Sequence, residues 1–145
     1  MICMASFDNP AFYGDSWADV YDEIAGTLDP GPAVEFLAGL AHEGRTLELA
    51  IGTGRVALPL TARGISVEGL DASVRMVEQL RAKEGGEAIP VVVGDMATVE
   101  VDGQFRLVYL VYNTLFHLLS QDRQAQCFRN VARIDRKSTR PNSSH

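Results

Sequence analysis

The chain has 145 residues, of which 46% are hydrophobic and 22% charged, so it is long enough to form one domain with a sizeable core. Its formal net charge of -6 argues against a general nucleic-acid surface, which would normally be basic, and no nucleic-acid partner is expected. Two cysteines, Cys3 and Cys127, have neither metal-site nor redox-motif spacing, and no metal site is expected.

The N-terminus lacks the basic region and the long apolar run of a signal peptide. No apolar segment reaches the length that spans a bilayer. The sequence therefore predicts a cytoplasmic protein that does not associate with membranes.

The N-terminal part, residues 1–44, is expected to form an irregular arm followed by helices. Residues 1–16 form the arm. A helix is predicted over residues 17–28, and a Pro-Gly-Pro segment ends it because proline cannot continue a helix. A second helix is predicted over residues 33–41. Apolar residues spaced four apart are expected on the inward face of the first helix: Val20, Ile24 and Leu28.

Strand-like and helix-like segments alternate through residues 45–134, which predicts a parallel sheet with right-handed crossovers. Ser73 and Ser120 are placed to cap two of the helices. Pro59 falls near the end of the first turn of its helix, where a distortion is expected. The predicted strands are 46–51, 66–70, 89–93 and 105–111, and the predicted helices are 55–63, 74–83 and 121–133.

The stretch from Leu47 to Val56 reads Leu-Glu-Leu-Ala-Ile-Gly-Thr-Gly-Arg-Val. A short apolar strand breaks into Gly52-Thr-Gly54, and helix-forming sequence follows. Such a strand–glycine turn–helix unit presents backbone N–H groups to a ligand. Glycine permits the tight turn and close approach of the ligand.

Three acids follow the first three predicted strands in register: Glu48 within the first, Asp71 directly after the second and Asp95 just beyond the third. Because ligands bind outside the carboxyl ends of parallel strands, these carboxylates should converge on one crevice. Asp71 is placed to accept hydrogen bonds from a ribose diol, and Asp95 from the amine of a base. As single residues, Asp71 and Asp95 are equally explained as helix or turn caps.

The glycine spacing also fits a dinucleotide-binding fingerprint, since Gly52, Gly54 and Ala57 satisfy G-x-G-x-x-G/A. Glu48 separates the two interpretations. A carboxylate so close to the turn disfavours a pyrophosphate, whereas a cofactor with an ammonium group and a sulfonium suits an acidic crevice. The pattern therefore points to S-adenosylmethionine.

The ordered motifs resemble the class I S-adenosylmethionine-dependent methyltransferases of the methyltransferase-domain-25 or ubiE-like small-molecule type. Residues 48–54 are similar to the acid-x-Gly-x-Gly-x-Gly first motif, with Ala50 in place of the first glycine. Ala50 is expected to lie still within the strand, where alanine is tolerated. The resemblance extends from Trp17 to Ile134 and includes residues 69–76 (second motif), 94–96 (third motif) and 108–117 (fourth strand and its loop).

The resemblance implies a role for each matching residue. Glu48, with the backbone at Ala50 and Gly52, would hold the methionine portion of the cofactor. Asp71 would bind the ribose, and Asp95 with the Met96 N–H would bind the adenine. The remaining implied cofactor-site residues are Tyr21 near the cofactor, Gly54 in the turn, Ala72 and Met76 beside the adenine, and Val111 and Tyr112 at the pocket floor.

The resemblance also implies an α/β fold, namely a Rossmann-like three-layer αβα sandwich with a mainly parallel sheet. Strand order 3-2-1-4 is expected to be present, and strands 5–7 to be missing through C-terminal truncation. The fourth strand would then be an uncovered apolar edge, and poor solubility or partial unfolding is expected.

Residues 135–145 are polar and aperiodic, and they are predicted to form a disordered tail. The tail resembles the translation of a sequencing-library adapter, differing at Pro141, so it is expected to be artefactual.

The implied activity is methyl transfer from S-adenosylmethionine to a small-molecule acceptor. An NAD(P)-binding oxidoreductase domain and a non-catalytic nucleotide-binding fragment remain as alternatives. No catalytic residue is assigned, because a lone histidine such as His117 is more often a packing or capping residue than a base. The acceptor, its reacting atom and the oligomeric state are left open.

Overall fold

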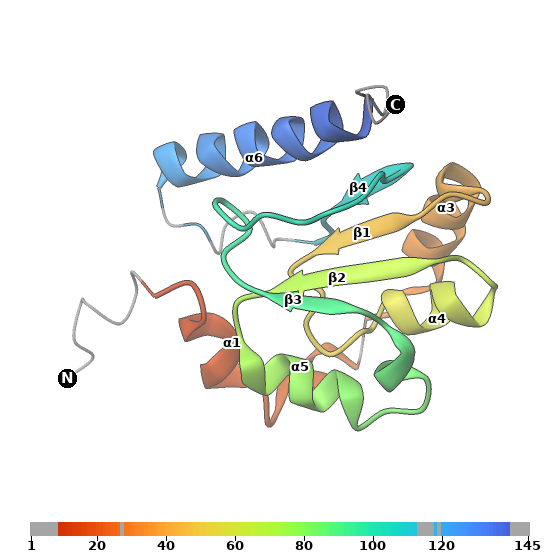
Figure 1. Ribbon diagram of the computed structural model, residues 1–145. Coiled ribbons are helices and arrows are strands. Elements are labelled where there is room, and N and C mark those ends of the chain that lie inside the picture. Colours follow the sequence, from red (N-terminus) through yellow and green to blue (C-terminus); the bar gives the residue numbers. More distant parts are fainter. Residues whose placement is uncertain (1–8, 27, 113–117, 119, 140–145) are drawn as a thin grey trace.

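The computed structural model describes residues 9–26, 28–112, 118 and 120–139, with side chains described as far as residue 134. Its centre is a four-stranded sheet in the order β3-β2-β1-β4, in which every neighbouring pair is parallel (Figure 1). The predicted strand order is therefore confirmed. The strands are β1 (Thr46–Leu49), β2 (Val67–Asp71), β3 (Val91–Val93) and β4 (Leu107–Tyr109).

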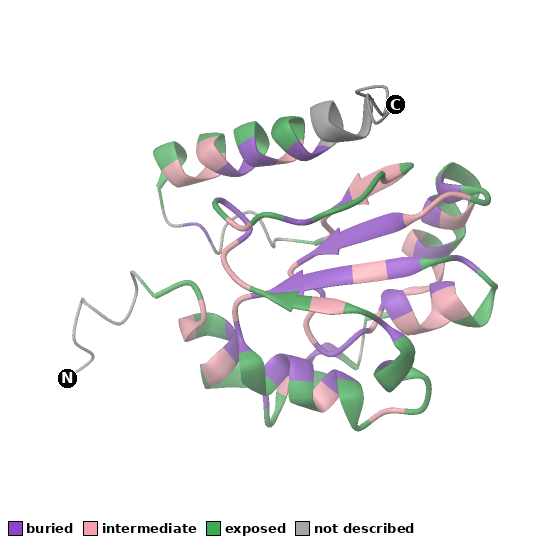
Figure 2. Cartoon of the chain, viewed as in Figure 1, coloured by how far each residue is buried: buried purple, intermediate pink, exposed green. Residues whose placement is uncertain are grey.

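Helices cover both faces of the sheet, which confirms the three-layer αβα arrangement (Figure 1). One apolar cluster joins the sheet to α3 (Gly31–Ala41), α4 (Ala57–Ala62) and α5 (Val74–Arg81). A second cluster joins the other face to α6 (Gln121–Thr139). β1 and β2 are buried along most of their length, whereas the outer strand β3 is largely exposed (Figure 2).

Alternation along β1 decides where its one acid points. Leu47 and Leu49 belong to the cluster beneath α6. Successive strand residues face opposite sides of a sheet, so Glu48 between them points toward the layer that contains α4. Glu48 lies opposite Gly69 of β2 and Tyr109 of β4, which places it in the interior of the sheet.

The predicted serine caps of two helices are confirmed. The Ser73 side chain accepts a hydrogen bond from the Met76 N–H at the start of α5, at 3.2 Å. Likewise, Ser120 Oγ accepts from the Arg123 N–H at the start of α6, at 3.2 Å. Each cap satisfies an N–H group that has no partner within the helix.

The conflict expected at Pro59 is absent because α4 begins at Ala57, two residues later than predicted. Pro59 is consequently the third residue of the helix. The first backbone N–H groups of a helix have no intrahelical acceptor, so the missing N–H of proline removes no hydrogen bond there. No distortion of the first turn is needed.

The prediction of one helix over residues 17–28 is wrong. The chain forms two short helices, α1 (Phe12–Trp17) and α2 (Tyr21–Ala25), so part of the expected arm is also helical. A face with four-residue spacing requires a continuous helix, and this one is interrupted between Trp17 and Tyr21. The residues expected to point inward are therefore exposed: Val20 by 39%, and Ile24 and Leu28 by 57% each.

The C-terminal helix is longer than predicted. α6 continues to Thr139, into the stretch expected to be disordered from residue 135. The sequence after Ile134 contains arginine and lysine and reaches no proline before Pro141, so nothing stops the helix at residue 134. Residues 140–145 lie outside the described part, and the adapter-like origin of the tail stays a prediction.

β4 is shorter than the predicted strand over residues 105–111, and it lies at one edge of the described sheet. Two of its residues, Leu107 and Val108, are only partly buried. The expectation of poor solubility therefore stays a prediction. None of the helices in the described ranges combines the length and the apolar character needed to cross a membrane.

We predict that Thr46→Val stabilises the protein by about 1 kcal/mol. Thr46 is fully buried at the start of β1, and its Oγ1 has no hydrogen-bond partner among the described residues. Valine keeps the shape and removes the unpaired hydroxyl. Urea unfolding measures the change. Thr61 is the control, because its hydroxyl donates to the Leu58 carbonyl at 2.9 Å, and Thr61→Val should lower the free energy of unfolding. An increase in the free energy of unfolding for both variants would contradict the explanation.

Candidate functional site

The turn between β1 and α4 contains three residues with left-handed backbone geometry: Ala50 (φ 54°), Gly52 (φ 58°) and Gly54 (φ 84°). The two glycines serve different purposes. A Cβ at Gly52 would meet nothing within 4 Å, so this position needs glycine for its φ angle. A Cβ at Gly54 would lie 2.4 Å from Leu80 Cδ1, so Gly54 also lets α5 pack closely against the turn.

Asp71 links the end of β2 to the glycine turn. Its Oδ2 accepts a hydrogen bond from the Gly52 N–H at 2.8 Å, and its Oδ1 accepts from the Ser73 N–H at 2.8 Å. Burial raises the pKa of this carboxyl, while the hydrogen bonds from Ser73 and Gly52 oppose the rise. Asp71 is the last residue of β2 rather than the first residue after it, and its carboxylate fixes the turn from the neighbouring strand.

Glu48 is a buried carboxyl group at the centre of the sheet, with an exposed fraction of 2%. The hydroxyl of Tyr109 donates to Glu48 Oε2 at 2.9 Å. Burial raises the pKa of Glu48 to about 8; the Tyr109 hydrogen bond opposes this and the nearby Asp71 adds to it. A group with this pKa is poised to ionise when a positive charge arrives beside it.

Two cavities that share residues lie along the glycine turn. The larger has about 670 Å³ of free space including its open mouth, and Asp71, Asp95 and Tyr13 of α1 are among the residues that line it. The smaller has about 310 Å³ and contains Glu48 in its wall. The residues common to both are Tyr21, Ala50 and Gly52.

Comparison with known proteins identifies the family. The profile of a family described as a methyltransferase domain matches residues 46–138, which is more than half of the chain. The chain belongs to this family.

Comparison with individual proteins agrees with this family assignment. YqeM of Bacillus subtilis (strain 168) is 30% identical over 121 residues, which are 81% of this chain and 49% of YqeM. The structure of the CcbJ methyltransferase from Streptomyces caelestis is 40% identical, with a TM-score of 0.75 over 89% of this chain and 53% of CcbJ. DhpI in complex with SAH has the same fold, with a TM-score of 0.73 at 21% identity over 94% of this chain and 67% of DhpI. The chain thus spans about half the length of YqeM and CcbJ.

Nearly all of the site residues predicted from the sequence border one of the two cavities of this methyltransferase domain. The exception is Gly54, which packs against Leu80 instead. The larger cavity is bordered by Tyr21, Ala50, Gly52, Asp71, Ala72, Met76, Asp95 and Met96. The smaller is bordered by Tyr21, Glu48, Ala50, Gly52, Val111 and Tyr112. His117 lies outside the described residues.

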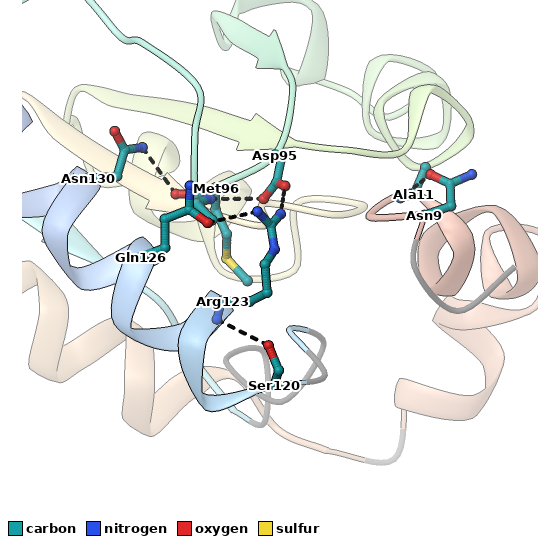
Figure 3. A network of polar contacts seen from close by, with 9 residues as sticks. Asn9, Ala11, Asp95, Met96, Ser120, Arg123, Gln126 and Asn130 are labelled. Carbon is teal, nitrogen blue, oxygen red and sulfur yellow. Dashed lines mark hydrogen bonds and ion pairs between the residues drawn. The ribbon is translucent and has the colours of Figure 1, made fainter. Parts of the chain in front are cut away.

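Asp95 is engaged by an arginine that the sequence did not single out. Its carboxylate forms an ion pair with Arg123 of α6 (Figure 3). Its Oδ1 accepts a hydrogen bond from the Ala97 N–H at 2.9 Å. Arg123 also donates to Gln126 Oε1 at 2.8 Å. A ligand amine would therefore have to share the Asp95 carboxylate with Arg123. No local sequence signal marks Arg123, because its partner lies 28 residues away.

The N-terminal helices are fastened over the cavities by polar contacts that sequence reasoning also missed. Asp15 Oδ1 accepts from the Ser73 hydroxyl at 2.6 Å, which ties α1 to α5. Asp22 of α2 accepts from the Thr53 hydroxyl at 2.7 Å and pairs with Lys83 at 2.7 Å. These contacts explain why α1 and α2 dock without burying a continuous apolar face. They also hold Tyr21 at the cavity wall.

Ala50 is not in the strand as expected, because β1 ends at Leu49 and Ala50 has a φ of 54°. A non-glycine residue in this region is strained by about 1 kcal/mol. We predict that Ala50→Gly raises the free energy of unfolding by about this amount, measured by urea denaturation. As a control, Ala132→Gly on the exposed side of α6 should lower stability by about 1 kcal/mol. A loss at both positions would contradict strain at Ala50.

Proposed function

We propose that this chain forms the S-adenosylmethionine site of a methyltransferase that acts on a small-molecule acceptor. The observation that supports it most is a set of three carboxylates around two cavities that share residues: Glu48 in β1, Asp71 at the end of β2 and Asp95 just after β3. Acidic walls favour a cofactor that carries a sulfonium and an ammonium group. The small-molecule acceptor rests on the methyltransferase type that the sequence motifs resemble.

In this proposal each acid binds a different part of the cofactor. Glu48 would meet the ammonium group in the smaller cavity. Asp71 would accept hydrogen bonds from the ribose hydroxyls beside the glycine turn. Asp95 and the Met96 N–H would bind the adenine, with Ala72 and Met76 against the ring. Tyr21, which borders both cavities, would lie over the junction of the two portions.

When bound, the cofactor supplies a methyl group already activated by its sulfonium. The work left to the protein is to orient the two reactants and exclude water. α1 and α2 are placed for the second task, since Tyr13 of α1 borders the larger cavity and Tyr21 of α2 borders both. The chain needs a base only where the acceptor must lose a proton during attack, and none is assigned.

Isothermal titration calorimetry of the chain with S-adenosylmethionine, S-adenosylhomocysteine and NAD⁺ tests the proposal. We expect saturable binding of the first two ligands with one site per chain, and no heat with NAD⁺. Heat with NAD⁺ alone would support the oxidoreductase alternative and contradict the proposal. Binding of S-adenosylmethionine without its conversion to S-adenosylhomocysteine, over a panel of acceptors, would favour the non-catalytic alternative.

A further inference from the structure

The buried face of α6 carries an asparagine where an apolar residue would fit. Cys127 and Ile134 on this face are buried, and Asn130 between them is buried as well. Burying an amide is costly unless its polar atoms are hydrogen-bonded. The Asn130 Nδ2 donates to the Met96 carbonyl at 3.1 Å (Figure 3). The same nitrogen donates to the Val99 carbonyl at 2.9 Å, so the amide fastens α6 to the loop that follows β3.

The loop over residues 95–99 is a tight turn with one defined geometry. The N–H groups of Thr98 and Val99 donate to the Asp95 carbonyl at 3.0 and 2.8 Å. The Ala97 N–H donates to the Asp95 side chain at Oδ1, at 2.9 Å, which is the contact typical of an Asx-turn. The turn thereby fixes the backbone from which Asp95 reaches the wall of the larger cavity.

Arg123 engages the other oxygen of the same carboxylate. It lies seven residues before Asn130, and therefore on the same face of α6. Its guanidinium forms an ion pair with Asp95 Oδ2 and donates to Gln126 Oε1 at 2.8 Å (Figure 3). The side chains of Asp95 and Arg123 are 15% and 37% exposed, so solvent screens this ion pair less than one at the surface. With a donor on each oxygen the carboxylate is held in one orientation, and its remaining lone pairs are left for a ligand.

We propose that Arg123 and Asn130 of α6 are positioning residues that make the larger cavity select a purine with an amine, rather than a carbonyl oxygen, at the edge facing Asp95. This inference rests on the proposed function, in which Asp95 binds the adenine. A carboxylate can only accept hydrogen bonds, so in a fixed orientation it attracts an amine and repels a carbonyl oxygen. A carboxylate that is free to turn away discriminates less. Neither Arg123 nor Asn130 is among the described residues that line the larger cavity, so both act through the loop over residues 95–99.

The test compares S-adenosylhomocysteine with S-inosylhomocysteine, in which a carbonyl oxygen replaces the amine of the base. Calorimetry measures the affinity for both ligands in the unaltered chain, in Arg123→Gln and in Asn130→Leu. We expect the unaltered chain to prefer S-adenosylhomocysteine by about 100-fold, and each variant to reduce this preference by about 10-fold. The control, Arg129→Gln, makes the same chemical change at an exposed position of α6 and should keep the full preference.

The preference is a ratio of two affinities, so it separates positioning from a general effect on the fold. Equal weakening of both ligands by Arg123→Gln would overturn the inference, because it would show that Arg123 only supports the fold. An unchanged preference in either variant would overturn it as well. Tighter binding of S-adenosylhomocysteine by Arg123→Gln would also overturn it, because it would show that Arg123 competes with the base for Asp95.

Two further measurements keep the test decisive. Should Asn130→Leu fail to fold, Arg123→Gln decides, and Arg123→Lys, which keeps the charge but loses the planar fork of the guanidinium, should retain part of the preference. If the unaltered chain binds both ligands equally, the inference fails while the proposed function stands. If it binds neither ligand, the proposed function fails and the inference with it.

Discussion

Replacing Glu48 by glutamine is expected to raise the free energy of unfolding by about 3 kcal/mol at pH 7. The carboxyl group is buried, and its pKa rises from 4.5 to about 8 in the folded protein. At pH 7 the unfolded chain gains free energy by ionising Glu48, whereas the folded protein keeps this group protonated. Glutamine has no such ionisation, so the substitution removes an advantage of the unfolded state.

The sign of this effect sets its pH dependence. Below about pH 4.5 both states hold the proton, and the contribution of Glu48 to stability is fully present. As the pH rises toward 8 the unfolded state holds fewer protons than the folded state, so this contribution is lost. The difference between Glu48→Gln and the unaltered protein should therefore be small at pH 4 and reach about 5 kcal/mol at pH 9. Burial and the neighbouring Glu48 raise the pKa of Tyr109, so this hydroxyl keeps its proton over the range.

Urea unfolding at pH 4, 7 and 9 measures the profile, with Glu87→Gln at an exposed site as the matched control. The control should follow the unaltered protein at every pH. Parallel profiles for Glu48→Gln and the unaltered protein would show that Glu48 is not protonated in the fold. The same substitution should lower the affinity for S-adenosylmethionine, because a neutral amide cannot neutralise the ammonium group of this ligand. A gain of stability with a loss of binding is the pattern expected of a binding-site residue.

The sheet, and the cavities that the candidate site residues border, were predictable where local sequence decides them. Glycine at positions 52 and 54 marks the turn because a left-handed φ and close packing exclude most side chains. The three acids could be predicted to approach one another because parallel strands bring their carboxyl ends to one edge. Glu48 carried the most information, since an acid inside an apolar strand has few structural explanations.

The remaining features depend on contacts between distant segments. The pairing of Asp95 with Arg123 and of Asp22 with Thr53 joins residues 28 and 31 positions apart, and no local pattern encodes either. The prediction that Ala50 lies within the strand was wrong because the pairing between β1 and β2 sets the end of β1. That pairing ends at Leu49. Periodicity at Ile24 predicted an inward apolar face, but the helix that would carry it is interrupted and Ile24 is exposed. Sequence patterns thus predicted the helices and strands better than the contacts between distant segments.

Replacing Asp71 by alanine is expected to lower the affinity for S-adenosylmethionine by at least about 100-fold and the free energy of unfolding by about 2 kcal/mol. Two effects combine. The carboxylate that holds the Gly52 and Ser73 N–H groups is lost, so the glycine turn loses its link to β2. The proposed acceptor for the ribose hydroxyls is lost with it.

The two effects can be separated by changing the ligand as well as the protein. S-adenosylhomocysteine and its 2′,3′-dideoxy analogue differ only in the hydroxyls that Asp71 is proposed to bind. In the unaltered protein the dideoxy ligand should bind more weakly, and in Asp71→Ala the two ligands should bind alike, because the interaction is already absent. Asp102→Ala, at an exposed site, should preserve the difference. If Asp71→Ala still prefers the ribose diol by the original ratio, Asp71 acts on binding only by holding the turn, and the ribose must be bound by another group.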